Sequence, residues 1–273
     1  METHRGSRYL HRADDGFLAR LAHDARSRTA SGYYAVEEGA RGGGASLLGA
    51  LSAEGRVPVI AEVKFRSPSE GVIAKRKDVV EIARAYQRGG AAAISVLTEP
   101  TNFGGRLEYL SQVRRAVKLP VLMKDVIVDE VQVRAGARAG ADAVLLIAAV
   151  FRSGMADRSL EEMVGLCHRE GAEVVVEVHD EEEFEQASGS EADVVGINNR
   201  DLRTLSVSLE TSRRLLSLGP HSKPVICESG ISGRGDVEAL LGLGARGFLV
   251  GSALMRASDP VAALGELTRV GPR

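Results

Sequence analysis

Charged side chains follow directly on apolar runs at several points along the chain. Residues 57–61 are apolar and lead into Glu62 and Lys64. Residues 121–123 are apolar and lead into Lys124. Because charged groups are seldom buried unless they are paired or functional, these positions are candidates for chemistry. A lysine among apolar neighbours would lose its proton more easily, which suits a general acid or a Schiff-base role for Lys124.

A carboxylate takes the same position after a run of valines. Glu177 follows residues 174–176, and at the end of a strand it could act as a general acid or base. Because side chains alternate along a strand, His179 would point to the same side as Glu177. It lies beyond the end of the strand, however, so we assign it a structural or supporting role. The alternative to these catalytic roles is a purely structural ion pair between Lys124 and Glu177.

Two glycine–serine pairs are typical of a phosphate site. Ser229-Gly230 follows one apolar run, and Gly251-Ser252 follows the next and begins a short helical turn. Glycines let backbone N–H groups approach an anion, and serines add hydroxyl donors. Ser67, in a Ser-Pro-Ser turn after the first apolar run, could extend the same grip. Two ordinary turns are the alternative.

The hydropathy pattern supplies the elements that would bring these residues together. Short aliphatic or β-branched segments predict strands over residues 57–63, 92–97, 120–124, 143–147, 173–178, 194–197, 224–227 and 247–250. Helical spacing of apolar residues lies between them, often ending in Gly-Ala before the next strand. Eight alternations predict a parallel sheet, and eight strands close into a (β/α)8 TIM barrel. An open doubly wound sheet would want a G-x-G-x-x-G turn after the first strand, where this chain has residues 64–71 without that motif.

The first 47 residues precede the barrel. An amphipathic helix is expected within residues 15–28, followed by a Gly-rich linker over residues 39–44. We therefore divide the chain into an N-terminal helical extension, residues 1–47, and a barrel catalytic domain, residues 48–273.

The C-terminal ends of barrel strands form one mouth, so polar residues at those ends should converge there. The strand-end residues are Glu62, Lys64, Ser95, Thr98, Glu99, Lys124, Asp125, Glu177, Asn198, Arg200, Glu228, Ser229, Gly251 and Ser252. The strand over residues 143–147 ends apolar, and Leu145 could supply a hydrophobic wall.

The composition restricts the partners of this chain. Lys and Arg number 35 against 37 Asp and Glu, a net charge of −2, which argues against a nucleic-acid or membrane surface. The sequence has no apolar run of membrane-spanning length and no signal-like start, and its two cysteines suit reduced, buried thiols. We therefore expect a cytoplasmic protein, either a monomer or a weak homo-oligomer, that acts on a small anionic molecule.

Seven motifs, in order, carry a family resemblance. They lie at residues 60–64 with 67–69, 95–99 with 103–105, 123–125, 177–180, 196–202, 228–231 and 251–255. On these motifs the chain resembles indole-3-glycerol phosphate synthase. The resemblance implies a (β/α)8 barrel with an N-terminal helical extension. It also implies conversion of 1-(2-carboxyphenylamino)-1-deoxy-D-ribulose 5-phosphate to indole-3-glycerol phosphate, CO2 and water, with no metal and no other cofactor.

The resemblance also assigns roles to residues of this chain. Lys124 would be the general acid at the ribulose carbonyl, and Glu177 would act as acid or base in the loss of water. Glu62 and Asn198 would orient the substrate, and Lys64 would contact its carboxylate or phosphate. Arg200 and Glu228 would complete the polar ring, and Phe103 and Leu145 would form an apolar wall that favours decarboxylation. The phosphate would be held by Ser67, Ser229, Gly230, Gly251 and Ser252.

Four positions depart from the family pattern. Phe65 stands where arginine is frequent, and Glu70 where lysine is common. Val126 replaces a frequent phenylalanine, and Arg106 replaces the usual serine. Since catalysis is assigned to none of the four, they bear on substrate affinity rather than on reaction type.

Two other functions fit a phosphate-binding barrel. A phosphoribosylanthranilate isomerase would rely on a Cys/Asp pair, whereas the first strand here carries Glu62 and Lys64. A non-catalytic barrel that binds a sugar phosphate should have lost Lys124 or Glu177, and both are present.

Overall fold

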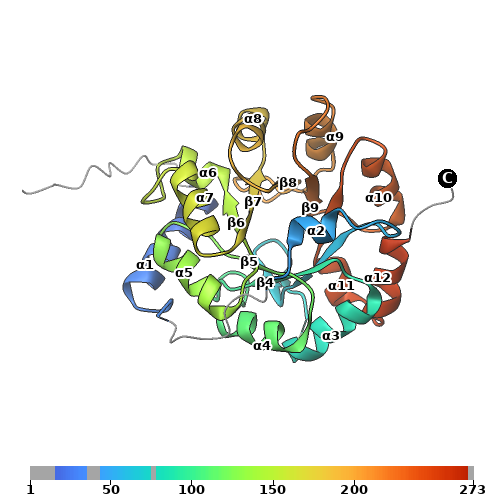
Figure 1. Ribbon diagram of the computed structural model, residues 1–273, viewed down its shortest axis with the longest axis horizontal. Helices are drawn as coiled ribbons and strands as arrows, with labels where there is room; N and C mark the ends of the chain where they lie inside the picture. The colour runs from blue at the N-terminus through green and yellow to red at the C-terminus, as the bar shows by residue number, and fades with distance from the viewer. Residues whose placement is uncertain (1–15, 36–43, 75–77, 270–273) are drawn as a thin grey trace, which may run out of the picture.

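In the computed structural model, which describes residues 16–35, 44–74 and 78–269, eight parallel strands close into a barrel (Figure 1). The barrel strands are β1 (Val59–Val63), β4 (Ala93–Leu97), β5 (Val121–Lys124), β6 (Ala143–Ile147), β7 (Glu173–Val178), β8 (Val194–Asn198), β9 (Val225–Glu228) and β10 (Gly247–Val250). Each strand pairs with the next barrel strand along the chain, and β10 pairs with β1 to close the ring. The predicted (β/α)8 barrel is confirmed.

Helices surround this barrel and follow its strands. They are α3 (Val79–Gly89), α4 (Glu108–Ala116), α5 (Glu130–Ala139), α7 (Leu160–Arg169), α8 (Glu181–Gly189), α9 (Glu210–Leu216), α10 (Arg234–Leu241) and α12 (Pro260–Thr268). Local signals set their ends. Asp78 accepts a hydrogen bond from Val80 N at 2.8 Å and caps α3, and Gly90 ends that helix with a φ of 87°.

Alternation along the strands decides what faces the barrel interior. Inward-facing Ile60, Leu122, Val175 and Ile226 belong to one buried apolar cluster inside the barrel. Because side chains alternate with a period of two, the next inward positions toward the C-terminal ends are polar. Those positions are Glu62, Lys124, Glu177 and Glu228. The same alternation that builds the core therefore aims these four side chains at the mouth.

The chain before the barrel covers both of its ends. Helix α1 (Phe17–Ala30) brings Leu21, Ala22 and Ala25 into the apolar cluster of the interior, and Leu21 reaches the mouth. Helix α2 (Leu47–Leu51) lies at the opposite end, where it packs Leu51 against Gly247. Most of the expected Gly-rich linker, residues 39–43, lies outside the described residues, and the division at residue 47 stays a prediction.

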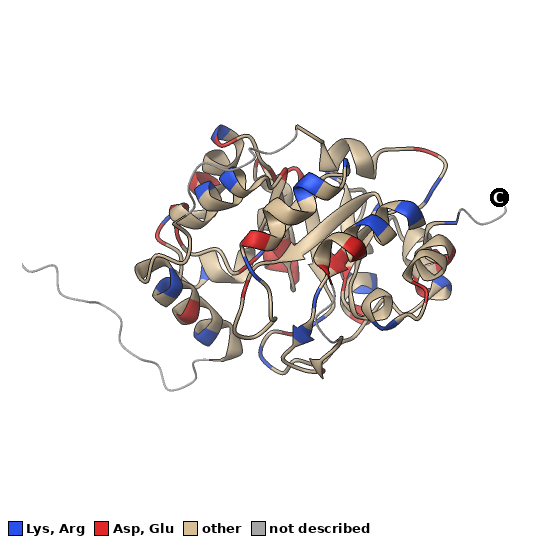
Figure 2. Ribbon diagram, turned by 90° about the horizontal axis from the view of Figure 1, so that it is seen from below, with Lys and Arg blue, Asp and Glu red and all other residues tan. Residues whose placement is uncertain are grey.

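The structure contains four short elements that the sequence pattern did not predict. They are α2, α6 (Ala148–Arg152), and the two strands of a hairpin after β1, β2 (Arg66–Ser67) and β3 (Gly71–Val72). Elements of two to five residues are too short to show a hydropathy period. The short helix α11 (Ser252–Arg256) does follow β10, at the predicted helical turn. Figure 2 shows Lys/Arg and Asp/Glu segments interspersed over the outer helices.

Candidate active site

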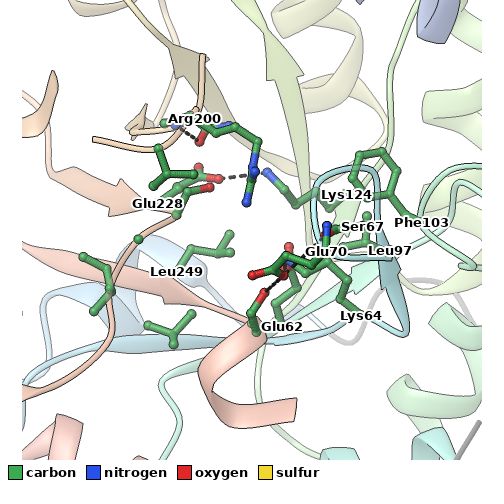
Figure 3. Close-up of a pocket in the computed structure, with 18 of the residues that line it drawn as sticks. Glu62, Lys64, Ser67, Glu70, Leu97, Phe103, Lys124, Arg200, Glu228 and Leu249 are labelled. Atoms are coloured by element: carbon green, nitrogen blue, oxygen red, sulfur yellow. Dashed lines mark hydrogen bonds and ion pairs between the residues drawn. The ribbon is translucent and has the colours of Figure 1, made fainter. Parts of the chain in front are cut away.

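The C-terminal ends of the barrel strands border a cavity of about 450 Å³. Residues of β1, β4, β5, β7, β8, β9 and β10 line it, together with the loops that follow these strands (Figure 3). Most residues singled out in the sequence meet here: Glu62, Lys64, Ser67, Phe103, Lys124, Glu177, Asn198, Arg200, Glu228, Ser229, Gly230, Gly251 and Ser252. The mouth of the barrel is therefore the candidate active site.

Leu145 is not part of this lining, which corrects the expected apolar wall. Its side chain is 1% exposed and belongs to the apolar cluster inside the barrel. Leu145 lies two residues before the end of β6, so it sits one layer below the cavity. Within the described part of the chain, the apolar side of the cavity is formed by Leu21, Leu97, Phe103, Val126, Leu202, Val207, Ile231, Leu249, Val250 and Ala253.

Lys124 lies between two carboxylates at the floor of the cavity. Its Nζ is 2.8 Å from Glu177 Oε2 and 2.8 Å from Glu228 Oε2. The three side chains come from β5, β7 and β9, and only the Lys124 side chain is noticeably exposed, at 17%. The ion pair between Lys124 and Glu177, considered above as a purely structural alternative, is therefore present, and it lies inside the cavity.

These contacts set the charges of the three groups. Burial disfavours the ammonium, but the Glu177 and Glu228 carboxylates outweigh it and raise the pKa of Lys124. This is the reverse of the direction expected from the apolar run, and it makes Lys124 a proton donor rather than a free amine. Burial acts against ionisation of Glu177 too, but Lys124, His179 and Asn198 together lower its pKa. Burial and the charge of Glu177 raise the pKa of Glu228 to about 7 despite Lys124.

A second row of polar residues holds Glu177 from the far side. Asn198 Nδ2 donates to Glu177 Oε1 at 2.9 Å, and His179 Nε2 is 3.4 Å from the same oxygen. The other ring nitrogen of His179 is 3.2 Å from Glu183 Oε2, and Glu183 in turn pairs with Arg152 at 2.9 Å. His179 thus supports Glu177, in keeping with its expected supporting role.

Glu62 and Lys64 form a separate pair on β1 and the loop after it. Lys64 Nζ is 2.8 Å from Glu62 Oε2. Glu62 is 2% exposed and lies against Gly251, where a β-carbon would be 2.2 Å from Glu62 Oε2. The glycine at position 251 is needed to admit the carboxylate.

The loops after β9 and β10 have the geometry of an anion site. Ser229 and Gly230 both have positive φ, 64° and 79°, and Asn199 Nδ2 donates to Ser229 O at 3.1 Å. A serine in this region is uncommon and is found most often at functional sites. Ser252 follows β10 on the neighbouring loop, so both glycine–serine segments line the cavity.

The β2–β3 hairpin reaches over the mouth and supplies a residue that sequence reasoning did not place in the site. Glu70 Oε2 accepts from Ser252 Oγ at 2.6 Å and from Ser67 Oγ at 3.3 Å (Figure 3). Arg200 Nη1, from the loop after β8, donates to Ser69 Oγ at 2.5 Å. The departure of Glu70 from the family pattern was the available signal, but its contacts depend on the hairpin.

A buried network under the mouth ties α1 to the strand ends. Arg28 Nη1 is 2.9 Å from Glu99 Oε1, and Tyr34 OH donates to Asp125 Oδ2 at 2.9 Å. Thr98 Oγ1 donates to the same Asp125 oxygen at 2.5 Å. Asp125 is the residue after Lys124, so the extension braces the strand that carries the lysine. The sequence showed Asp125 and Glu99 at strand ends but offered no signal for Arg28 or Tyr34.

Among residues 16–35, 44–74 and 78–269, no group of three His, Cys, Asp or Glu side chains is placed to hold a metal ion. In the same part of the chain no helix is long and apolar enough to span a membrane.

Known proteins resemble this chain in sequence and in fold. The indole-3-glycerol phosphate synthase of Methanopyrus kandleri is 52% identical over 238 residues, which cover 85% of this chain and 90% of that protein. The enzyme of the same name from Leptothrix cholodnii is 47% identical over 223 residues, covering 81% and 83%.

The solved structures add the fold alone. A thiamine phosphate pyrophosphorylase from Pyrococcus furiosus superposes with a TM-score of 0.55 at 23% identity, covering 77% of this chain and 93% of that one. An N-acetylmannosamine-6-phosphate 2-epimerase from Clostridium perfringens gives 0.58 at 18% identity, covering 76% and 90%.

The protein family described as indole-3-glycerol phosphate synthase matches residues 38–267, which include every barrel strand and all the residues that line the cavity except Leu21. With this match and the two relatives above, the chain belongs to the indole-3-glycerol phosphate synthase family, the carboxy-lyases of tryptophan biosynthesis.

Proposed function

We propose that this protein converts 1-(2-carboxyphenylamino)-1-deoxy-D-ribulose 5-phosphate to indole-3-glycerol phosphate, CO2 and water. The observation that carries the proposal is the position of the Lys124 ammonium, 2.8 Å from Glu177 and 2.8 Å from Glu228, in a cavity rimmed by the glycine–serine loops. A sugar phosphate with its phosphate at those loops would place its carbonyl over the floor.

Substrate binding divides between two sides of the cavity. The phosphate lies against Ser229, Gly230, Gly251 and Ser252, with Ser67 facing them from the hairpin. The aromatic ring lies on the apolar side, where Phe103, Leu97 and Val126 line the cavity. Lys64 and Arg200 are the cations available to the carboxylate of the ring.

Ring closure requires a proton at the carbonyl oxygen. The aryl carbon that bears the carboxylate forms a bond to the carbonyl carbon, and the Lys124 ammonium donates its proton to the oxygen, which becomes a hydroxyl. The ring nitrogen then carries the positive charge. Glu62 and Glu177 line this part of the cavity with negative charge, to which Glu228 adds when it is ionised, and this charge stabilises the iminium-like intermediate.

Decarboxylation and dehydration complete the conversion. The carbon–carbon bond to the carboxylate breaks, and its electron pair neutralises the iminium charge; an apolar wall favours this loss of charge. The hydroxyl then leaves as water with a proton from solvent, while ionised Glu177 accepts the proton that the adjacent ring carbon gives up. Glu177 passes this proton to Lys124, 2.8 Å away, which restores both groups. In balance, each turnover takes one proton from solvent.

The experiment is to follow indole fluorescence after the purified protein is mixed with the substrate, without added metal or cofactor. Wild-type protein should form product. Lys124→Ala should be slower by about 100-fold or more. Lys118→Ala, which alters an exposed lysine outside the cavity, is the matched control and should be as fast as wild type. No product from wild type, or normal turnover in Lys124→Ala, would overturn the proposal.

A further inference from the structure

Glu70 is one of the charged residues of the mouth to which the proposed reaction gives no role. It lies in the turn of the β2–β3 hairpin and lines the cavity beside Ser67 (Figure 3). One oxygen of its carboxylate accepts hydrogen bonds from Ser252 Oγ at 2.6 Å and from Ser67 Oγ at 3.3 Å. The same two serines are residues to which we assign the substrate phosphate.

The surroundings of this carboxylate suit an anion. Its second oxygen lies 3.5 Å from Arg256 Nη1. Partial burial opposes ionisation, but the hydrogen bond from Ser252 and the charges of Arg256 and Lys64 lower the pKa of Glu70. The side chain is 26% exposed, so it is packed on one side and open to solvent on the other. Glu70 is therefore held as an anion by hydroxyls and cations of the kind that bind phosphate.

We propose that, in the free enzyme, the Glu70 carboxylate occupies the phosphate site formed by Ser67 and Ser252, which we call the phosphate seat. The sugar phosphate must then displace this carboxylate in order to bind. This inference rests on the proposed function, since it takes Ser67 and Ser252 as phosphate ligands. A serine hydroxyl has one proton to donate, so it cannot serve the carboxylate and a phosphate oxygen at once. Two anions on the same pair of hydroxyls would also repel each other.

The hairpin allows the exchange without unfolding. Glu70 N donates to Ser67 Oγ at 3.2 Å, and Arg200 donates to Ser69 Oγ at 2.5 Å, so the turn has anchors besides the carboxylate. Ile73 N donates to Phe65 O at 2.9 Å and closes the base of the hairpin. Rotation of the Glu70 side chain toward solvent is enough to release both serines.

The consequence is a lowered affinity for every phosphate ligand. A small anion has only the seat itself to bind, so the internal carboxylate competes with it fully. The sugar phosphate has further contacts along the cavity, which offset the cost of displacing Glu70. Glu70 thus raises the concentration of inorganic phosphate that is needed to fill the site, and it raises the KM for the sugar phosphate as well.

The test measures the dissociation constant of inorganic phosphate by titration calorimetry for wild type, Glu70→Gln and Glu70→Ala. Glu238→Gln is the matched control, because it removes a carboxylate on α10 that pairs with Arg234 on the surface. We expect both Glu70 variants to bind phosphate about tenfold or more tightly than wild type, and the control to bind as wild type does. Thermal unfolding in phosphate-free buffer checks that all four proteins are folded.

Two results would overturn the proposal. The first is a phosphate dissociation constant within about twofold of wild type in both Glu70 variants. The second is weaker binding in both variants, which would make Glu70 a support of the seat and not its occupant.

The phosphate titration does not depend on turnover, so the two proposals fail separately. If wild type forms no indole product, the proposed reaction fails, while the titration still decides what Glu70 does. If product forms and phosphate binding is the same in all four proteins, only the Glu70 proposal fails. In an active enzyme, the KM for the sugar phosphate should fall in Glu70→Gln together with the phosphate dissociation constant.

Discussion

Gly251 and Glu62 touch across the junction of the first and last strands of the barrel. β1 and β10 pair directly, and a β-carbon on Gly251 would lie 2.2 Å from Glu62 Oε2. Lys64 Nζ is 2.8 Å from that same oxygen. The missing side chain at position 251 therefore leaves the space that positions the Glu62–Lys64 pair, in addition to any contact of Gly251 with phosphate.

Gly251→Ala should reduce kcat/KM by about 100-fold, because the methyl group would push the Glu62 carboxylate out of place. The φ at this position is −120°, outside the left-handed region that favours glycine, so we assign the loss to the contact with Glu62. Gly265→Ala is the control, since a β-carbon there meets nothing within 4 Å. Steady-state kinetics of both variants make the comparison. Unchanged activity in Gly251→Ala would mean that Glu62 can move without loss.

Glu177→Gln keeps the shape of the side chain and removes its charge. We expect kcat to fall by about 100-fold, because a neutral amide cannot accept the proton released in dehydration. The dissociation constant of inorganic phosphate should change by less than about twofold, since Glu177 contacts Lys124, Asn198 and His179 and not the phosphate loops. Glu182→Gln, at a side chain 81% exposed, serves as the control. A large loss of phosphate binding in Glu177→Gln would contradict the assigned role.

His179 should stabilise the fold in a pH-dependent way. Burial alone would lower its pKa, but Glu177 and Glu183 outweigh burial and raise the pKa of His179 from 6.5 to about 9. A raised pKa in the folded state means that the stabilisation is fully present below pH 6.5 and is lost as the pH rises through about 9. The shift corresponds to about 3 kcal/mol in the free energy of unfolding.

Urea unfolding of wild type and His179→Gln at about pH 6 and about pH 9.5 measures this contribution. The difference in unfolding free energy between the two proteins should be larger at the lower pH. His23→Gln, at an exposed position on α1, is the control for the loss of a histidine. The same difference at both pH values for His179→Gln would show that the imidazole does not carry the charge.

Arg28→Met should destabilise the protein by about 3 kcal/mol, because it leaves two buried carboxylates without their cation. Glu99 is 1% exposed and Asp125 is 4% exposed, and Arg28 lies 2.9 Å and 3.6 Å from them. Arg84→Met, at an exposed position on α3, is the control. Chemical denaturation of both variants gives the comparison. A loss of less than about 1 kcal/mol in Arg28→Met would mean that the network is no stronger than a surface ion pair.

The residues that end strands were the predictable part of the site. Glu62, Lys124, Glu177 and Glu228 follow apolar residues with a period of two, and in a parallel barrel that pattern can lead only to the mouth. Leu145 was expected to supply an apolar wall of the site, but it does not line the cavity. Its depth in the barrel depends on the register of β6 against its neighbours, which the sequence pattern does not show.

The charge states of the site residues could not be predicted from the sequence, for a similar reason. An apolar run before Lys124 predicts a lowered pKa, whereas the structure raises it because Glu177 and Glu228 come within 2.8 Å from strands more than 50 and 100 residues away. The hydrogen bond from Tyr34, which follows α1, to Asp125 could not be predicted either, because it joins residues 91 positions apart.

The barrel, the family and most of the side chains of the mouth could be predicted from the sequence, whereas the place of Glu70 in the mouth and the depth of Leu145 could not. The predictable features follow from patterns of two to seven residues, in which local geometry sets the direction of each side chain. The contacts between these side chains depend on the tertiary structure. The pairing of Lys124 with two carboxylates, the space at Gly251 for Glu62, and the seating of Glu70 between Ser67 and Ser252 all join separate strands and loops. Contacts of this kind depend on distances of a few ångströms between distant parts of the chain, which spacing along the sequence does not encode.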